Sequence, residues 1–398
     1  MRKSKNSRND ITKWLIHFVK DVNYKNIPGK TDDMFDFFSK DELEDGTSAF
    51  EVLREIIKVG GILARPSFRN GKTTLYGGEK VVCATEMPLY SFYKYASLRK
   101  SAGNVSSIGI AFLKKQFFAE GGRQAIYGLS KPLKFKKGGN TPFYRILLES
   151  CLPIQEQYRY VHVQLNGPGW TDWTHEREWR WKKTQPWHSI WREDSYEGLP
   201  LFKQDKHCCI DRFIVIVNDL EQAKIIQSDL TGFYLSGGNN YGTSFSRNVI
   251  KKVRIINMSE VVDKIEKSNF HEYETIEGLE KKDLIKPLIL FSPPTTLQKQ
   301  KIDNCLKNAN TLAIKIKIPN ASLAIGRCRV LSQEISNKWI QKMILSGLVD
   351  PPFDGIVVIH TGLFGSQLID ENEARAEKCK NELEKVFGKI FYLDPQFD

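Results

Sequence analysis

Two glutamates lie in the most aromatic stretch of this 398-residue sequence. Six of its eight tryptophans fall between Trp170 and Trp191, and Glu176 and Glu178 stand among them together with two arginines. A carboxylate can stabilise the positive charge that develops at a sugar carbon when a glycosidic bond breaks. Arginines can bind the phosphates of the same substrate. The stretch is therefore the first candidate for a site where a nucleotide reacts.

An extended chain would place the two carboxylates side by side. The aromatic content of WTHEREWRW favours a strand, in which side chains alternate between two faces. Glu176 and Glu178 would then share a face, about 7 Å apart at roughly 3.3 Å per residue, whereas in a helix they would point about 200° apart. That shared face is either a reactive cleft or a solvent-facing ladder of charges. The residues alone leave both interpretations open.

The elements that would position this strand can be read from local patterns. SAFEVLREIIKVGG, from Ser48, has apolar residues at helical spacing and ends in glycines, which predicts a helix. GEKVVCATEMP, SSIGIAFL, RQAIYGLS and YRYVHVQLNG predict short strands, and residues 22–46 predict a polar insertion. IDRFIVIVND, DLEQAKIIQSDL and NVIKKVRIINM predict a strand, a helix and a strand. From Lys286 we expect a separate α/β segment, with strands near PLILFS, TLAIKIKIP and GIVVIHTG.

The charge is concentrated around the aromatic stretch. The net charge is +12, and between Lys94 and Lys183 there are 16 lysines or arginines against 6 acidic residues. This surplus favours a polyanion such as nucleic acid as a partner, although a solvated basic surface is equally compatible.

Composition and targeting signals indicate the compartment. We find no apolar run of the roughly 20 residues that span a bilayer, no signal-peptide pattern, and an odd, scattered set of seven cysteines. These features predict a cytoplasmic protein without a membrane partner. The spacing of His207, Cys208 and Cys209 predicts no metal site.

The order of several segments resembles a family of phage-defence proteins. LIHFV, FEVLREIIKVGGIL, VVCATEMPLYSF, IGIAF, GGRQAIYG and WTHEREWRW follow one another, over about residues 10–220, as in AbiGi-like abortive-infection proteins. Those proteins in turn resemble the ADP-ribosyltransferase fold of DarT-type toxins. The resemblance implies a split-sheet ADP-ribosyltransferase-like domain in residues 1–220. It does not cover the rest of the chain, where the local patterns predict a βα extension and connector in 221–284 and a C-terminal α/β domain of unknown role in 285–398. The whole chain is therefore predicted to be α/β (α+β).

The resemblance also implies catalytic residues and a site for NAD. Glu178 matches the catalytic glutamate, and Glu176 matches the first carboxylate of an E-x-E pair that lies beside the acceptor. His17 matches the first-strand residue that contacts the adenosine-side ribose.

The remaining positions follow from the middle motif and the segment after it. Thr85 stands where that motif supplies a hydroxyl, Tyr90 and Tyr93 are candidates for stacking on nicotinamide, and Arg123 would neutralise a phosphate. The chain departs from the pattern in reading CATE where CFTE is commoner, and in the long insertion between His17 and its helix.

These expectations describe an NAD-dependent ADP-ribosyltransferase toxin of antiphage defence by abortive infection. DNA or RNA is the favoured acceptor, and an antitoxin or a phage-derived trigger would be a further partner. Two alternatives stay open. The enzyme could modify a protein or hydrolyse NAD, or the chain could be a non-enzymatic nucleic-acid-binding or phage-sensing protein whose glutamates are surface charges.

Overall fold

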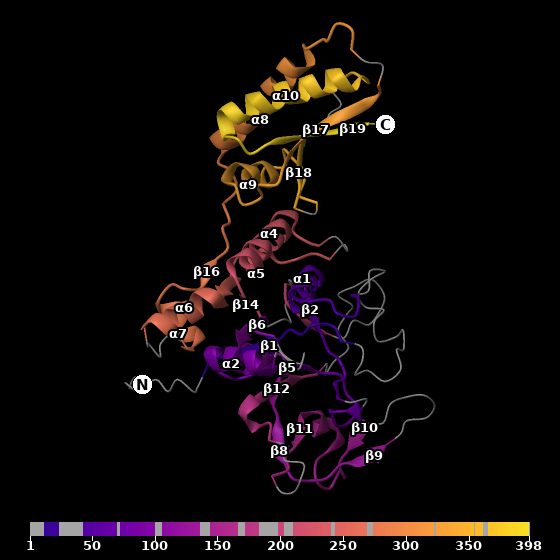
Figure 1. The fold of residues 1–398 in the computed structure, drawn as a ribbon, viewed down its shortest axis with the longest axis vertical. Coiled ribbons are helices and arrows are strands. Elements are labelled where there is room, and N and C mark those ends of the chain that lie inside the picture. The colour runs from indigo at the N-terminus through magenta and orange to yellow at the C-terminus, as the bar shows by residue number, and fades with distance from the viewer. Residues whose placement is uncertain are drawn as a thin grey trace. The chain divides into compact units, whose positions relative to one another are not determined.

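The computed structural model describes residues 12–23, 43–69, 72–99, 106–135, 144–165, 172–182, 198–202, 210–239, 243–268, 274–321, 324–353, 355–360 and 365–397 (Figure 1). Helices and sheets are mixed along the chain, which confirms the α/β (α+β) class. Two compact units are present. Unit 1 holds residues 1–224 and 241–287, and unit 2 holds residues 225–240 and 288–398. The segment expected to be an extension and connector is thus shared between the units.

Unit 1 is built on a hydrogen-bonded sheet of eight strands. Their order across the sheet is β16, β15, β14, β6, β1, β5, β12 and β7. Neighbours are antiparallel except β14 and β15, which run parallel with α4 (Leu220–Ser236) between them. This is the predicted strand–helix–strand unit. The strand bounds are β1 Trp14–Phe18, β5 Val82–Thr85, β6 Gly109–Leu113, β7 Arg123–Gln124, β12 Glu178–Trp181, β14 Phe213–Val217, β15 Arg254–Asn257 and β16 Lys286–Pro287.

The sheet is divided between β1 and β5. β1 pairs with β6 along all five of its residues, and four residue pairs join β5 to β12. Within the described residues, however, β1 and β5 share one pair, Ile16 with Thr85. Two half-sheets therefore meet at a single ladder pair, and we call this junction the fork.

Helices cover both faces of the sheet. The face that carries Ile16 is packed by α2 (Leu89–Arg99), α6 (Met258–Ser268) and α7 (Ile276–Lys281). On the other face, Phe117 of α3 (Lys114–Ala119) stacks on Phe112 at 4.9 Å between ring centroids. The large buried aromatic and aliphatic side chains on both faces fix the position of each strand.

Local capping explains where the first helix begins and ends. α1 (Ala49–Val59) starts where the Ser48 hydroxyl accepts a hydrogen bond from the backbone N–H of Glu51. It ends at Gly60, which has a φ of 80°. Both ends lie where the sequence predicts them.

Short elements complete unit 1. The predicted strands at 82–85, 109–113 and 160–162 are confirmed, whereas RQAIYGLS forms two short strands, β7 and β8, in different sheets. The remaining elements are β2 Gly61–Leu63 with β13 Gly198–Pro200, β3 Phe68–Arg69 with β4 Lys72–Thr73, β8 Ile126–Gly128 with β11 Tyr160–His162, β9 Leu133–Phe135 with β10 Tyr144–Ile146, the 3₁₀ turns η4 Ile154–Arg159 and η5 Thr174–Glu176, and α5 Arg247–Ile250.

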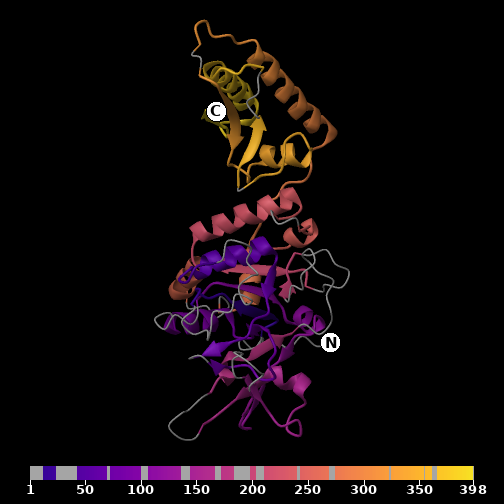
Figure 2. The ribbon, with the colours of Figure 1, turned by 90° about the vertical axis from the view of Figure 1, so that its right-hand side faces the viewer.

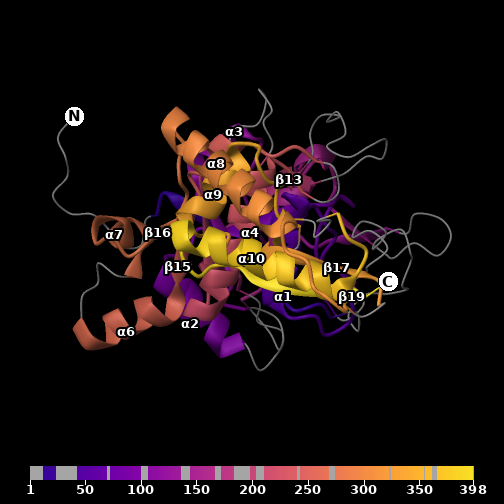
Figure 3. The same ribbon diagram turned by 90° about the horizontal axis from the view of Figure 1, so that it is seen from above.

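Unit 2 contains a three-stranded antiparallel sheet in the order β18 (Val357–His360), β17 (Gly326–Ser332) and β19 (Tyr392–Phe397). The helices α8 (Thr296–Ile314) and α10 (Ile369–Phe387) lie side by side (Figures 1 and 3), and α9 spans Lys338–Leu345. Figure 2 shows α8 in orange and α10 in yellow from another side. The strand predicted in TLAIKIKIP is wrong, because its first four residues form the last turn of α8.

Candidate functional site

The two glutamates come from a turn and from the start of a strand. The strand predicted over WTHEREWRW is wrong in its first half. Thr174–Glu176 form a 3₁₀ turn, and Arg177 adopts a left-handed φ of 45° before β12 begins at Glu178. Asp172 caps the turn, because its carboxylate accepts hydrogen bonds from the backbone N–H (2.9 Å) and the hydroxyl (2.6 Å) of Thr174. The alternation that would place both carboxylates on one face therefore does not apply.

Two residues of the CATE segment hold this turn, which we call the 174–177 turn. The Thr85 hydroxyl donates to the carbonyl oxygen of Glu176 and accepts a hydrogen bond from the backbone N–H of Met87 at 3.1 Å. The backbone N–H of Glu86 donates to the carbonyl oxygen of Arg177 at 3.2 Å. Thr85 is completely buried. Its hydroxyl acts on the site by fixing the backbone of Glu176.

Glu178 is bound by Arg180, which stands two residues further along the same strand face. Nε and Nη2 of Arg180 donate to the two carboxylate oxygens at 3.0 and 2.8 Å. The two side chains are only 15% and 7% exposed. Burial opposes ionisation of the carboxyl, but the guanidinium outweighs it and holds the pKa of Glu178 below its usual value. Glu178 is thus an ionised carboxylate with a fixed orientation.

Glu176 has the opposite tendency. Burial raises the pKa of Glu176, the hydrogen bond that it accepts from the Tyr95 hydroxyl opposes this rise, and the charge of Glu178 adds to it. The environments of the two carboxyl groups therefore push their pKa values apart. Such a pair can supply a constant negative charge at one residue and a proton acceptor at the other.

His17 lies in the fork. Its Nδ1 is 2.8 Å from the carbonyl oxygen of Cys83 on β5. Because a carbonyl only accepts, Nδ1 carries the proton and Nε2 is left as an acceptor. Burial lowers the pKa of His17 to about 4, so the ring is neutral at pH 7. We find no partner for Nε2 in the described residues, so this nitrogen can accept a hydrogen bond.

The other three candidates make contacts of a different kind. The rings of Tyr90 and Tyr93 stack on each other at 6.2 Å and pack against the core of the α2 face. Arg123 donates to the carbonyl oxygens of Phe118 and Gly122, both at 2.8 Å, at the end of α3. The structure thus brings Glu176, Glu178, Thr85 and His17 to the junction of β1, β5 and β12. None of the contacts described for Tyr90, Tyr93 and Arg123 is with these four residues.

The sequence interpretation missed two tyrosines of the site. The ring centroids of Tyr95 and His175 lie 5.4 Å apart, and the guanidinium carbon of Arg99 lies 4.9 Å from the centroid of the Tyr95 ring. Helical spacing from Phe92 to Tyr95 and Arg99 was a usable signal for this face of α2. Tyr127 accepts a hydrogen bond from the backbone N–H of Glu178 at 2.9 Å, and no pattern in the sequence indicates it.

Some of the lysines and arginines between Lys94 and Lys183 are neutralised by ion pairs within unit 1. Among the described residues, five of these cations form ion pairs, with Glu79, Glu86, Glu156 or Glu178. The cations in question are Lys114, Arg159, Arg177, Arg180 and Lys182. The positive field available to a polyanion is therefore smaller than the sequence count indicates.

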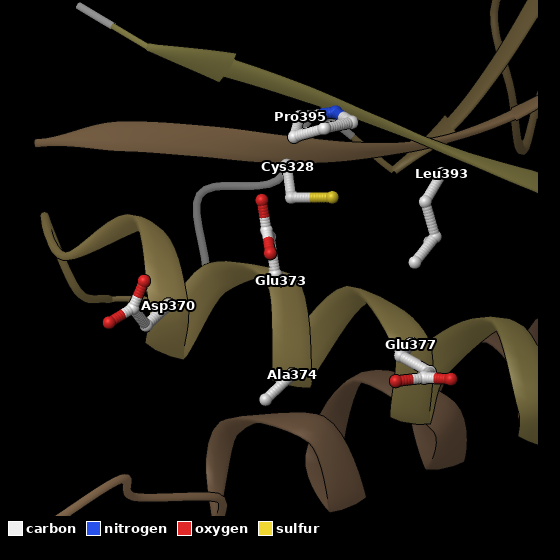
Figure 4. Close-up of a pocket in the computed structure, with 7 residues that line it drawn as sticks. All are labelled: Cys328, Asp370, Glu373, Ala374, Glu377, Leu393 and Pro395. Atoms are coloured by element: carbon white, nitrogen blue, oxygen red, sulfur yellow. The ribbon is translucent and has the colours of Figure 1, made fainter. Parts of the chain in front are cut away.

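Unit 2 has a pocket of about 430 Å³ between α10 and the sheet (Figure 4). Burial raises the pKa of its Cys328 to about 11, so the thiol is protonated at pH 7 and is a poor nucleophile. In the described parts of the chain, no group of three or more histidine, cysteine, aspartate or glutamate side chains is placed to hold a metal ion. The pocket is lined by Cys328, Asp370, Glu373, Ala374, Glu377, Leu393 and Pro395.

Comparison with known proteins finds no match to any family model, curated protein or solved structure. None of the described helices is long and apolar enough to cross a membrane. His207, Cys208 and Cys209, for which the sequence predicts no metal site, lie outside the described residues.

Proposed function

We propose that this protein is an NAD-dependent ADP-ribosyltransferase that acts as an effector of bacterial antiphage defence, with nucleic acid as its favoured acceptor. The observation that carries the proposal is the group of residues at the fork. A neutral His17, whose Nε2 has no partner among the described residues, lies at the fork. The junction also holds a fixed anionic carboxylate, Glu178, and a carboxyl with a raised pKa, Glu176.

The proposed reaction uses the two carboxylates for different tasks. The bond between ribose C1′ and the nicotinamide nitrogen breaks, nicotinamide leaves with the electron pair, and positive charge develops on the ribose. Glu178 stabilises that charge. The acceptor then forms a bond to C1′ and loses its proton to Glu176. One preorganised electrostatic group is typically worth about 3–4 kcal/mol, and the charge of Arg180 offsets part of this contribution.

The choice of acceptor rests on charge. The segment from Lys94 to Lys183 keeps a positive surplus, and a phosphate backbone is the polyanion that such a surface binds through counterion release. A protein acceptor and simple NAD hydrolysis use the same ribose chemistry, so the experiment has to separate these products.

The test is incubation of the purified protein with labelled NAD and with DNA, RNA or total cell protein. The proposal predicts label in material that nuclease digests and protease does not. Label that survives nuclease but not protease would identify a protein acceptor, and NAD loss without label would identify hydrolysis. If neither label transfer nor NAD loss occurs, the proposed activity is refuted. For the variant Glu178→Gln, the matched control is Glu79→Gln. Glu79 is a carboxylate that is 42% exposed and pairs with Lys182, one residue beyond β12.

A specific observation favours a second candidate function. Both oxygens of Glu178 are bound by Arg180, as in a purely structural ion pair. A nucleic-acid-binding or phage-sensing protein without catalysis would have the same pair. Its biological activity would survive Glu178→Gln in a folded variant, and its binding to nucleic acid would fall steeply with salt concentration.

A further inference from the structure

Glu86 is a buried carboxylate that is not among the predicted catalytic or NAD-binding residues. It is 5% exposed. Oε1 accepts hydrogen bonds from Nζ of Lys114 at 2.7 Å and from Nη2 of Arg177 at 3.1 Å, and Oε2 accepts one from Nε1 of Trp179 at 2.9 Å. A carboxylate buried this deeply requires such partners. Their identity shows what Glu86 holds in place.

The partners of Glu86 come from both half-sheets. Lys114 directly follows β6, and its backbone N–H donates to the carbonyl oxygen of Lys13 beside β1 at 2.8 Å. Arg177 and Trp179 flank Glu178 in the other half-sheet. Along the strands, Glu86 lies on one side of the Ile16–Thr85 pair, and the contact between His17 and Cys83 lies on the other. Glu86 therefore links the half-sheets on the side of the Ile16–Thr85 pair opposite to His17.

Arg177 is the residue whose conformation needs this support. Its φ of 45° is unfavourable for a residue with a side chain. Glu86 contacts it twice, through the carboxylate on the guanidinium and through its backbone N–H on the carbonyl oxygen. Without these contacts the segment WTHEREWRW is free to adopt the extended conformation that its composition favours. Glu176 would then turn away from its bond to Tyr95.

We propose that Glu86 is a positioning residue, which sets Glu176 and Glu178 relative to the fork by holding the 174–177 turn. Glu86 has no contact with substrate in this scheme and acts through Arg177 and Trp179. The kinetic part of this inference rests on the proposed function. The structural part, control of the turn by Glu86, does not.

The test compares Glu86→Gln with Glu79→Gln and the unchanged protein in two measurements. The first is hydrogen exchange of the amides in residues 174–179. The second is kcat and KM for NAD loss, with the melting temperature measured alongside. We expect Glu86→Gln to speed exchange in this segment and to lower kcat by about 10²-fold through misplacement of the carboxylates. KM for NAD should change by less than about threefold, because the contact between His17 and Cys83 is untouched. Glu79→Gln should change neither exchange nor kcat.

Unchanged exchange in Glu86→Gln, or an equal loss of kcat in Glu79→Gln, overturns the inference. A rise in KM with kcat unchanged also overturns it, because that would be a binding defect. If Glu86→Gln does not fold, Trp179→Phe removes one of the three hydrogen bonds and keeps an aromatic ring, and the same pattern should appear with smaller amplitude. If the unchanged protein consumes no NAD, the proposed function fails. Exchange then decides by itself whether Glu86 holds the turn.

Discussion

Replacement of Glu178 by glutamine should destabilise the protein, because the carboxylate neutralises a buried guanidinium. Both side chains are largely buried, and two hydrogen bonds of 3.0 and 2.8 Å join them. Removing one partner of a buried ion pair typically costs about 3–5 kcal/mol. We expect a value near 3 kcal/mol, because the glutamine oxygen can still accept from Arg180 and Nη1 of Arg180 keeps its bonds to two carbonyl oxygens. For a unit of this size the melting temperature should fall by about 6–12 °C.

A double-mutant cycle measures this energy directly. Urea denaturation of Glu178→Gln, Arg180→Met and the double variant should give a coupling energy of about 2–3 kcal/mol, since the double variant leaves no unpaired charge. The effect should also depend on pH. The folded pKa of Glu178 lies below the ordinary value of 4.5, so its stabilisation is complete above pH 4.5 and is lost as the pH falls through the folded pKa. A Glu178→Gln variant within about 0.5 kcal/mol of the unchanged protein at pH 7 would contradict the buried pair.

Three further predictions follow from other contacts. The pKa of His17 falls from 6.5 when unfolded to about 4 when folded, so stability should decrease as the pH falls from 6.5 to 4, and denaturation of His17→Gln should lack this component. Tyr95→Phe removes the hydrogen bond that lowers the pKa of Glu176, so the acidic limb of a plot of activity against pH should move to higher pH. A loss of more than about 1.5 kcal/mol in the free energy of unfolding would instead show that this bond has a larger structural role. Gln341 is fully buried in unit 2, accepts a hydrogen bond from the backbone N–H of Phe291 (2.9 Å) and donates one to the carbonyl oxygen of Ile289 (3.0 Å). Gln341→Leu should therefore lower the free energy of unfolding, measured with urea, by about 1–3 kcal/mol, and Gln298→Leu at a more exposed position should lower it less.

Elements that depend on local signals could be predicted from the sequence. The Ser48 cap and the stop at Gly60 define α1, and the apolar run Ile214–Val217 defines a buried central strand. The alternation of Glu178 and Arg180 also holds, because β12 is extended from Glu178 onward. What the alternation does not show is that the arginine binds the glutamate and leaves no free guanidinium for a phosphate.

The 174–177 turn could not be predicted, because its conformation is set by distant residues. Thr85 and Glu86 hold the backbone of Glu176 and Arg177 across 91 positions of sequence. These contacts outweigh the strand propensity of the aromatic segment, as tertiary context often does. The error in TLAIKIKIP has a different cause. The buried positions Ile302, Ala309 and Ala313 continue the helical period of α8 into a stretch whose alternation is typical of a strand.

The division of α4 between the units has a consequence for synthesis on the ribosome. Residues 225–240 belong to unit 2, but the rest of that unit begins at residue 288. At about 5–20 residues per second, the last 111 residues take roughly 5–20 s to emerge. Unit 1 can fold during that interval, while residues 225–240 wait for the chain that completes their unit. This interval is when the nascent chain is most exposed to a chaperone or a protease.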